Sequence, residues 1–202
     1  MTKTYRPAVA IATYFVLCAL VHVPYTVLLR SGVIERSPAW SLAMAVLGMS
    51  ICVAEVVFFA VVLAQRGGSL KLFTKIPIAL VMWIAGYSAL VRIANIAAGY
   101  DFELFNTFWK AHRALLGDTV PTINSMLAVP VLCWLGMSFD RGSLPRVAAV
   151  LAAYETLFTL VLWGVVANHV SIPTGVYYFN LVQYYVLWAL FYGSMACYKC
   201  KQ

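Results

Sequence analysis

Residues 87–95 read Tyr-Ser-Ala-Leu-Val-Arg-Ile-Ala-Asn, and they place an arginine and an asparagine inside a long apolar run. The run covers about residues 76–98, which is long enough to cross a lipid bilayer as a helix. An arginine near the centre of a membrane helix costs about 3 to 17 kcal/mol, depending on the method of measurement. Arg92 therefore needs a partner, and the other segments of the chain have to supply it.

The composition is that of an integral membrane protein. Apolar residues make up 63% of the 202 residues and charged residues only 10%, whereas soluble domains contain about 45–50% and 25%. The net charge of +7 comes from basic residues that stand singly or in pairs between apolar runs. Since Lys and Arg accumulate in the cytoplasmic loops of membrane proteins, this excess does not indicate a nucleic-acid partner. The lipid bilayer is the partner that the composition predicts.

Six stretches are long and apolar enough to span a membrane, and none shows the alternating pattern of a β-barrel. We therefore expect an all-α polytopic membrane protein, with a six-transmembrane-helix bundle as a single domain over residues 1–202. The first apolar run lacks a small-residue cleavage site and should remain as an anchor. The expected spans are about 9–29, 40–64, 76–98, 121–138, 147–168 and 177–197.

The distribution of basic residues predicts the orientation. With the N-terminus inside, the inner segments hold nine basic residues and the outer loops hold four. We therefore expect both termini in the cytoplasm, with the protein in the plasma or inner membrane. The nine are Lys3, Arg6, Arg66, Lys71, Lys75, Arg141, Arg146, Lys199 and Lys201, and the four are Arg30, Arg36, Lys110 and Arg113.

The segment between Gly99 and Pro121 is expected to form an outer interfacial amphipathic helix over about residues 102–116. Asp101 is the expected N-cap and Gly117 the expected end. Such a helix lies on the membrane surface, either as a ledge against lipid headgroups or as a lid over an outward-facing cavity. Its apolar face contains Phe105, Phe108, Trp109, His112, Leu115 and Leu116.

Eight polar residues inside or beside the spans are candidates for ligand binding or ion coupling. Glu55 and Glu155 lie roughly 12–14 Å from the inner boundary, and Arg92 lies roughly 24 Å from it. The expected layout is a pair of carboxyl groups near the midplane beneath an outer layer of basic and amide groups. The candidates are Arg92, Glu55, Glu155, Asn95, His22, Asn124, Asn180 and Gln183.

Three environments could compensate the charge of Arg92: an ion pair with Glu55 or Glu155, a solvated cavity, or an anionic partner. Interhelical hydrogen bonds in membranes are worth only about 0.6–2 kcal/mol each, which suffices for amides and not for buried charges. A carboxyl group left without the arginine would be protonated at neutral pH. A proton-coupled transporter requires such a group, and a glutamate that is merely tolerated in its neutral form would have the same property.

The sequence contains no motif that indicates catalysis, a metal site or a cofactor. The three histidines are scattered, and no phosphate-binding glycine loop or nucleophile elbow is present. Cys18, Cys52 and Cys133 lie inside apolar runs, where free cysteine behaves as a small hydrophobic residue. Cys197 and Cys200 form a CxxC pair without a second pair, for which we expect plain thiols rather than a metal or redox role.

These observations favour a protein that binds or transports a small polar or anionic solute, with proton coupling through a glutamate. The first alternative is a non-catalytic subunit or assembly partner of a membrane complex, whose buried charges fix helix packing or meet a partner span. The second is a membrane-embedded lipid-modifying enzyme that uses Glu55, Glu155 and Arg92. The sequence favours a role without catalysis over the enzyme.

Overall fold

The computed structural model describes residues 5–196, and every regular element among them is helical. The all-α class is thereby confirmed. The expected CxxC pair, Cys197 and Cys200, lies outside the described residues, as do Lys3, Lys199 and Lys201. The elements are α1 (Arg6–Arg30), α2 (Pro38–Arg66), α3 (Leu72–Gly99), α4 (Glu103–Arg113), the π-helix η1 (Ala114–Thr119), α5 (Val120–Met137), α6 (Leu144–Ala167) and α7 (Thr174–Ser194).

Several helices begin at a proline, and two of the connections between helices contain a glycine with positive φ. Proline occupies the first turn of α1, α2 and α6, where its missing N–H would have no intrahelical partner. At the start of α2 the Ser37 hydroxyl accepts a hydrogen bond from the Trp40 N–H (3.2 Å). The turns after α1 and α5 contain Gly32 and Gly142 at φ +75° and +74°, a conformation that favours glycine.

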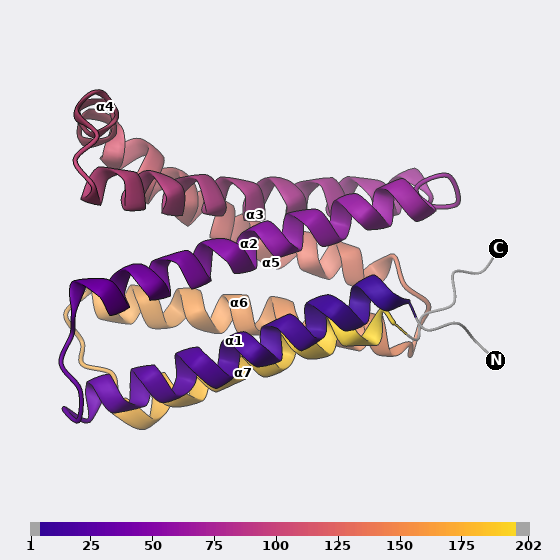
Figure 1. The fold of residues 1–202 in the computed structure, drawn as a ribbon. Coiled ribbons are helices and arrows are strands. Elements are labelled where there is room, and N and C mark those ends of the chain that lie inside the picture. Colours follow the sequence, from indigo (N-terminus) through magenta and orange to yellow (C-terminus); the bar gives the residue numbers. More distant parts are fainter. Residues whose placement is uncertain (1–4, 197–202) are drawn as a thin grey trace.

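The six long helices close into a ring. Each packs against its neighbours along the chain, in the pairs α1–α2, α2–α3, α3–α5, α5–α6 and α6–α7, and α7 packs against α1. Figure 1 shows these helices side by side with their axes roughly aligned. Successive helices run in opposite directions and are joined at the two ends of the bundle. At one end the Tyr5 N–H donates to the Ala196 carbonyl (3.2 Å), so both ends of the described chain lie together. The ring surrounds an interior into which every long helix can project side chains.

Among the described residues, five helical stretches are long and apolar enough to cross a membrane: residues 6–30, 38–66, 72–99, 103–137 and 144–167. Residence in a membrane is therefore supported. The stretch 103–137 counts as one because α4, η1 and α5 follow one another without a break. Helix α7 is not among the five, and its sequence contains five tyrosines, which lower its hydropathy.

The segment before α5 differs from the expectation in two respects. The helix does not end at Gly117, because Gly117 lies within η1, and the N-cap position is Phe102 rather than Asp101. Pro121 has no N–H to donate to the carbonyl of residue 117, which disfavours regular α-helical hydrogen bonding at this point. The Val120 N–H donates to the Leu115 carbonyl, five residues earlier. The Leu116 carbonyl accepts a hydrogen bond from the Tyr87 hydroxyl (2.9 Å).

Helix α4 lies across the end of the bundle and is seen nearly end-on in Figure 1. Only part of the expected apolar face points away from the protein. Trp109 is 6% exposed and donates its indole N–H to Asn95 Oδ1 on α3 (3.2 Å), whereas Leu104, Phe105 and Phe108 are exposed.

The tightly packed part of the core lies toward the end where Tyr5 and Ala196 meet. An aromatic cluster fills it, in which the rings of Phe15 and Phe58 lie 5.3 and 5.1 Å from that of Tyr192. Between α5 and α6, a Cβ at Gly136 would lie 3.2 Å from the Cβ of Ala149, so small residues allow close approach of these helices. The cavities described next lie outside this cluster.

Candidate functional site

Arg92 extends from α3 across to one face of α2. The ideal position of a Cβ at Gly48 lies 2.5 Å from Arg92 Nη1 and 3.0 Å from Cζ, so the guanidinium group occupies space that any larger residue at 48 would fill. The Cys52 thiol, one turn along α2, is the polar neighbour of the guanidinium. Gly48, Cys52 and Glu55 follow one another at i, i+4 and i+7, which places them on a single helical face.

The reach of Arg92 explains why it does not pair with Glu55. Helices α2 and α3 are antiparallel and share the turn after Arg66, so positions can be counted from that turn. Glu55 lies 11 residues and Gly48 lies 18 residues before the end of α2 at Arg66. Arg92 lies 20 residues after the start of α3 at Leu72. At 1.5 Å per residue, Gly48 is roughly level with Arg92, and Glu55 is roughly 13 Å nearer the turn.

Within residues 5–196 the guanidinium group has no oxygen acceptor at hydrogen-bonding distance. The hydrogen-bond partners of the two carboxyl groups are Tyr192, Thr159 and Trp188, and Arg92 is not among them. Arg92 nevertheless interacts electrostatically with Glu55. The Arg92 side chain is exposed and lines the two cavities described below.

The first cavity has a volume of about 220 Å³ and lies between α2, α3, α5, α6 and α7. It brings Arg92, Glu55 and Glu155 into one space, together with hydroxyl groups from four helices. Its remaining walls are apolar and aromatic. The polar lining residues are Cys52, Glu55, Ser88, Arg92, Ser125, Glu155, Thr156, Thr159 and Tyr184, and the larger apolar ones are Val81, Ile84, Leu132, Leu160, Trp163 and Trp188.

Helix α7 supplies a hydrogen-bond donor to each carboxyl group. The Tyr192 hydroxyl donates to Glu55 Oε1 (2.9 Å), and the Trp188 indole N–H donates to Glu155 Oε2 (3.3 Å). Trp188 and Tyr192 are four residues apart, and their rings stack with centroids 5.8 Å apart. The two carboxyl groups are thus held by adjacent turns of one helix face, and both are buried.

Glu155 belongs to a chain of side-chain hydrogen bonds between α6 and α7. Thr159 Oγ1 lies 2.7 Å from Glu155 Oε1 and 3.1 Å from Asn180 Oδ1. A hydroxyl group has one proton, so it can donate to only one of these oxygens. With the amide oriented as in the structure, both contacts are satisfied when Glu155 is protonated and donates to Thr159, and Thr159 donates to Asn180.

A second cavity of about 360 Å³ lies between α1, α2 and α7 and meets the first at Arg92. Cys52, Arg92 and Tyr184 line both cavities. His22, on α1, lines the second cavity, where its Nδ1 lies 2.9 Å from the Tyr185 hydroxyl. Arg92 therefore lies at the junction of two spaces, with the carboxyl groups in the first and the histidine in the second.

The amide candidates lie apart from the cavities. Asn95 accepts from Trp109 and thus holds α4, while Asn180 contacts Thr159. Asn124 and Gln183 have buried amide nitrogens without a hydrogen-bond partner among the described residues. Arg92, Glu55, Glu155 and His22 line one or both of these two cavities, and none of the four amides lines either of them.

Sequence reasoning did not identify Gly48, Tyr192 and Thr159 as members of the site. Thr159 follows Glu155 by one helical turn, and Gly48 shares a face with Glu55, so helical spacing from each glutamate could have indicated both. Tyr192 could not be selected in this way, because α7 contains several tyrosines and only packing determines which one reaches Glu55.

No group of three or more His, Cys, Asp or Glu side chains that could hold a metal ion occurs within residues 5–196. A scan against protein-family models, a search of curated proteins and a search of solved structures each found no match to this chain. Functional inference therefore rests on the chemistry of the two cavities.

Proposed function

We propose that this protein is a six-span membrane protein that binds or transports a small polar or anionic solute, with proton coupling through a glutamate. The observation that supports this most directly is the position of Arg92. Its permanent positive charge lines a cavity with two carboxyl groups and has no oxygen acceptor among residues 5–196. A cation held in this way provides a binding site for an anion or for the negative end of a dipolar solute.

The position of α7 in the ring supports the proposed six-span arrangement. Helix α7 packs between α1 and α6, both of which are long and apolar enough to cross a membrane. A helix that runs beside two spans and carries buried residues at both of its interfaces crosses the membrane with them. Three of its polar side chains, Asn180, Tyr185 and Tyr192, have hydrogen-bond partners inside the bundle, as a helix in lipid requires.

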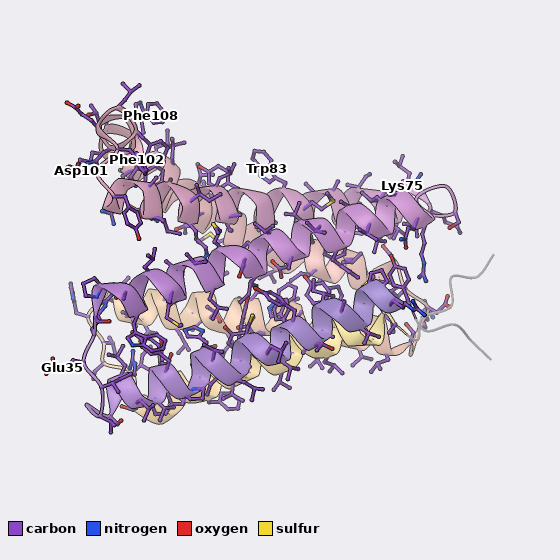
Figure 2. All side chains as sticks on the ribbon, in the orientation of Figure 1. Glu35, Lys75, Trp83, Asp101, Phe102 and Phe108 are labelled. Atoms are coloured by element: carbon purple, nitrogen blue, oxygen red, sulfur yellow. The ribbon has the colours of Figure 1, made fainter. Side chains whose placement is uncertain are left out.

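The orientation that we propose has both termini in the cytoplasm. In Figure 2, Lys75 lies at the end of the bundle near the start of α1, and Glu35 and Asp101 lie toward the opposite end. Within the described residues the first end carries six basic residues and one acidic residue, Asp140. Since positive charge accumulates on the cytoplasmic side, this end is the cytoplasmic one. The six are Arg6, Arg66, Lys71, Lys75, Arg141 and Arg146.

Helix α4 is the proposed interfacial helix on the outer side. Phe102 and Phe108, labelled in Figure 2, lie at the outer end of the bundle, and both are exposed, as are Leu104 and Phe105. Exposed aromatic and aliphatic residues on a helix that runs across the bundle axis fit the boundary between headgroups and acyl chains. In this position α4 borders the outer ends of α3 and α5.

Flux measurements in proteoliposomes test the proposed function. Chloride, phosphate, lactate, benzoate and glycerol serve as probe solutes, and protein-free liposomes give the baseline rate for each. We expect at least one anion to move faster than the baseline, and we expect Arg92→Gln to remove that increment. Replacement of a carboxyl group by Glu55→Gln or Glu155→Gln should alter the pH dependence of the rate. Arg141→Gln and Glu35→Gln, which change exposed residues outside the cavities, serve as matched controls.

Two results would contradict the proposal. One is that no probe solute moves faster than in protein-free liposomes or binds the purified protein. The other is that Arg92→Gln and Arg141→Gln give equal rates. If Arg92→Gln reduced only the yield of folded protein, the role of an assembly subunit would be supported in place of transport.

Cysteine labelling tests the topology independently of function. In a variant without the native cysteines, Lys75→Cys and Glu35→Cys place single thiols at opposite ends of the bundle. We expect a membrane-impermeant maleimide to label residue 35 from the outside of intact cells and residue 75 only after lysis. The opposite pattern would reverse the proposed orientation.

A further inference from the structure

The charges in the first cavity place a condition on the ligand. Arg92 is always protonated, so an empty cavity reaches zero net charge when one of the two glutamates is ionised and the other is protonated. The Arg92 side chain is exposed, but both glutamates are buried, and an uncompensated charge on a buried carboxyl group is strongly unfavourable. When a monovalent anion binds against Arg92, zero net charge is recovered only if the second glutamate also takes up a proton. Binding of the anion therefore requires the uptake of one proton.

The structure indicates that Glu55 is the group that takes up the proton. Arg92 interacts electrostatically with Glu55, and both line the cavity beside Cys52 on the α2 face. Glu155, in contrast, contacts Thr159, which in turn contacts Asn180. With the Asn180 amide oriented as in the structure, both contacts are satisfied when the Glu155 carboxyl group carries a proton. Glu155 is thus the carboxyl that stays neutral, and Glu55 is the one that alternates between states.

The walls and size of the cavity indicate the rest of the ligand. Between the guanidinium of Arg92 and the carboxyl groups the lining is largely apolar, with Ile84, Leu132, Leu160 and Trp188 among its members. A volume of about 220 Å³ lies below the range of about 300–1,000 Å³ that is usual for drug-sized ligands. A small inorganic anion would leave these walls without contacts. A dianion would bring a second charge for which the cavity has no cation.

We infer that the cavity takes a small monovalent organic anion with an apolar body, such as an aromatic or short-chain monocarboxylate, and that each anion binds together with one proton taken up by Glu55. This inference rests on the proposed function and specifies its substrate class. The carboxylate of the ligand contacts Arg92, and its apolar body extends along the apolar wall toward the two protonated glutamates.

The other titratable groups around the cavity do not supply the proton site. Cys52 on α2 and Tyr184, Tyr185 and Tyr192 on α7 carry thiol and phenol groups, which are ordinarily protonated at neutral pH and so cannot take up a further proton there. Helices α3 and α5 contribute no titratable group to the first cavity besides Arg92. His22 on α1 lines only the second cavity, and its substitution therefore serves as a test of the assignment.

Calorimetric titration of benzoate into the purified protein tests the inference. The measurement is made at one pH in buffers of different ionisation enthalpy, because the dependence of the observed enthalpy on the buffer gives the number of protons taken up. We expect one proton per benzoate. We expect benzamide, which is neutral, and phthalate, which is a dianion, to bind at least tenfold more weakly than benzoate, as should inorganic phosphate.

Variants then assign the groups. Arg92→Gln should weaken benzoate binding at least tenfold. Glu55→Gln should bind benzoate with no proton uptake, whereas Glu155→Gln and His22→Asn should retain one proton per anion. Size-exclusion chromatography and thermal unfolding verify that each variant is folded, and Arg141→Gln controls for the loss of an arginine outside the cavity.

The possible failures are distinguishable. If benzoate binds without proton uptake, or if uptake persists in Glu55→Gln and disappears in Glu155→Gln or His22→Asn, the proton assignment is wrong. If phosphate or chloride binds in an Arg92-dependent way and benzoate does not, the substrate class is wrong and the proposed function stands. If no anion binds in an Arg92-dependent way, both proposals are wrong.

Discussion

The guanidinium group of Arg92 lies against the backbone of Gly48, at the level on α2 that matches its own position on α3. This contact directs the side chain across the bundle instead of along it toward the glutamates. Because Gly48 has no side chain, the charged group can reach the junction of the two cavities. Glycine at position 48 is therefore a determinant of where the positive charge lies.

Gly48→Ala should displace Arg92 without removing its charge. A Cβ at residue 48 would lie 2.5 Å from Nη1, so the guanidinium must move away from its present position. We expect anion binding to weaken about tenfold, equivalent to about 1.4 kcal/mol. Titration calorimetry measures the change. Gly164→Ala on α6 is the matched control, since nothing lies within 4 Å of a Cβ there, and it should leave binding unchanged. Equal affinities in the two variants would contradict the role assigned to Gly48.

Tyr192→Phe should destabilise the protein by about 1–3 kcal/mol, because it leaves the buried Glu55 carboxyl without its donor. Thermal unfolding in detergent measures this as a lower Tm. Tyr154→Phe removes a hydroxyl from an exposed tyrosine and should have little effect. In the double variant with Glu55→Gln the two effects should not add, because the residues are in direct contact. Simple additivity would show that the contact contributes nothing to stability.

Thr159→Val should remove the two hydrogen bonds through which Thr159 links Glu155 to Asn180, while keeping the shape of the side chain. We expect a loss of stability of about 1–3 kcal/mol, since a buried carboxyl loses one of its partners. Thr156→Val, one turn earlier on the same helix, is the control because its hydroxyl donates only to the Ala152 carbonyl (2.9 Å). Both variants are compared by thermal unfolding. A larger loss for Thr156→Val would contradict the importance of the Glu155 contacts.

Trp109→Phe should loosen α4 from α3, because it removes the hydrogen bond to Asn95 and part of a buried ring. Faster hydrogen–deuterium exchange in residues 103–113 is the expected result, with little change in α6. Trp83→Phe provides the control, since Trp83 is 60% exposed and in Figure 2 points away from the bundle. Unchanged exchange in α4 would show that other contacts hold this helix.

Composition and apolar periodicity were sufficient to predict the all-α class and residence in a membrane. Long apolar runs with few charges leave the backbone no alternative to helices in a bilayer. Hydropathy does not select α7 as a span, because its tyrosines lower its mean hydropathy. Its packing between α1 and α6 is what places it in the bundle. The end of the segment at Gly117 was predicted wrongly, because the π-helix continues through a residue that usually ends helices.

The amino-acid sequence alone placed Arg92, Glu55 and Glu155 within apolar runs that are long enough to cross a membrane. Their partners depend on the tertiary structure. The absence of a side chain at Gly48, the reach of Tyr192 to Glu55 and the position of Thr159 beside Asn180 depend on how helices distant in sequence pack together. Hydropathy reports the free energy of each segment in lipid, whereas contacts between segments depend on their relative rotation and tilt, which hydropathy does not contain.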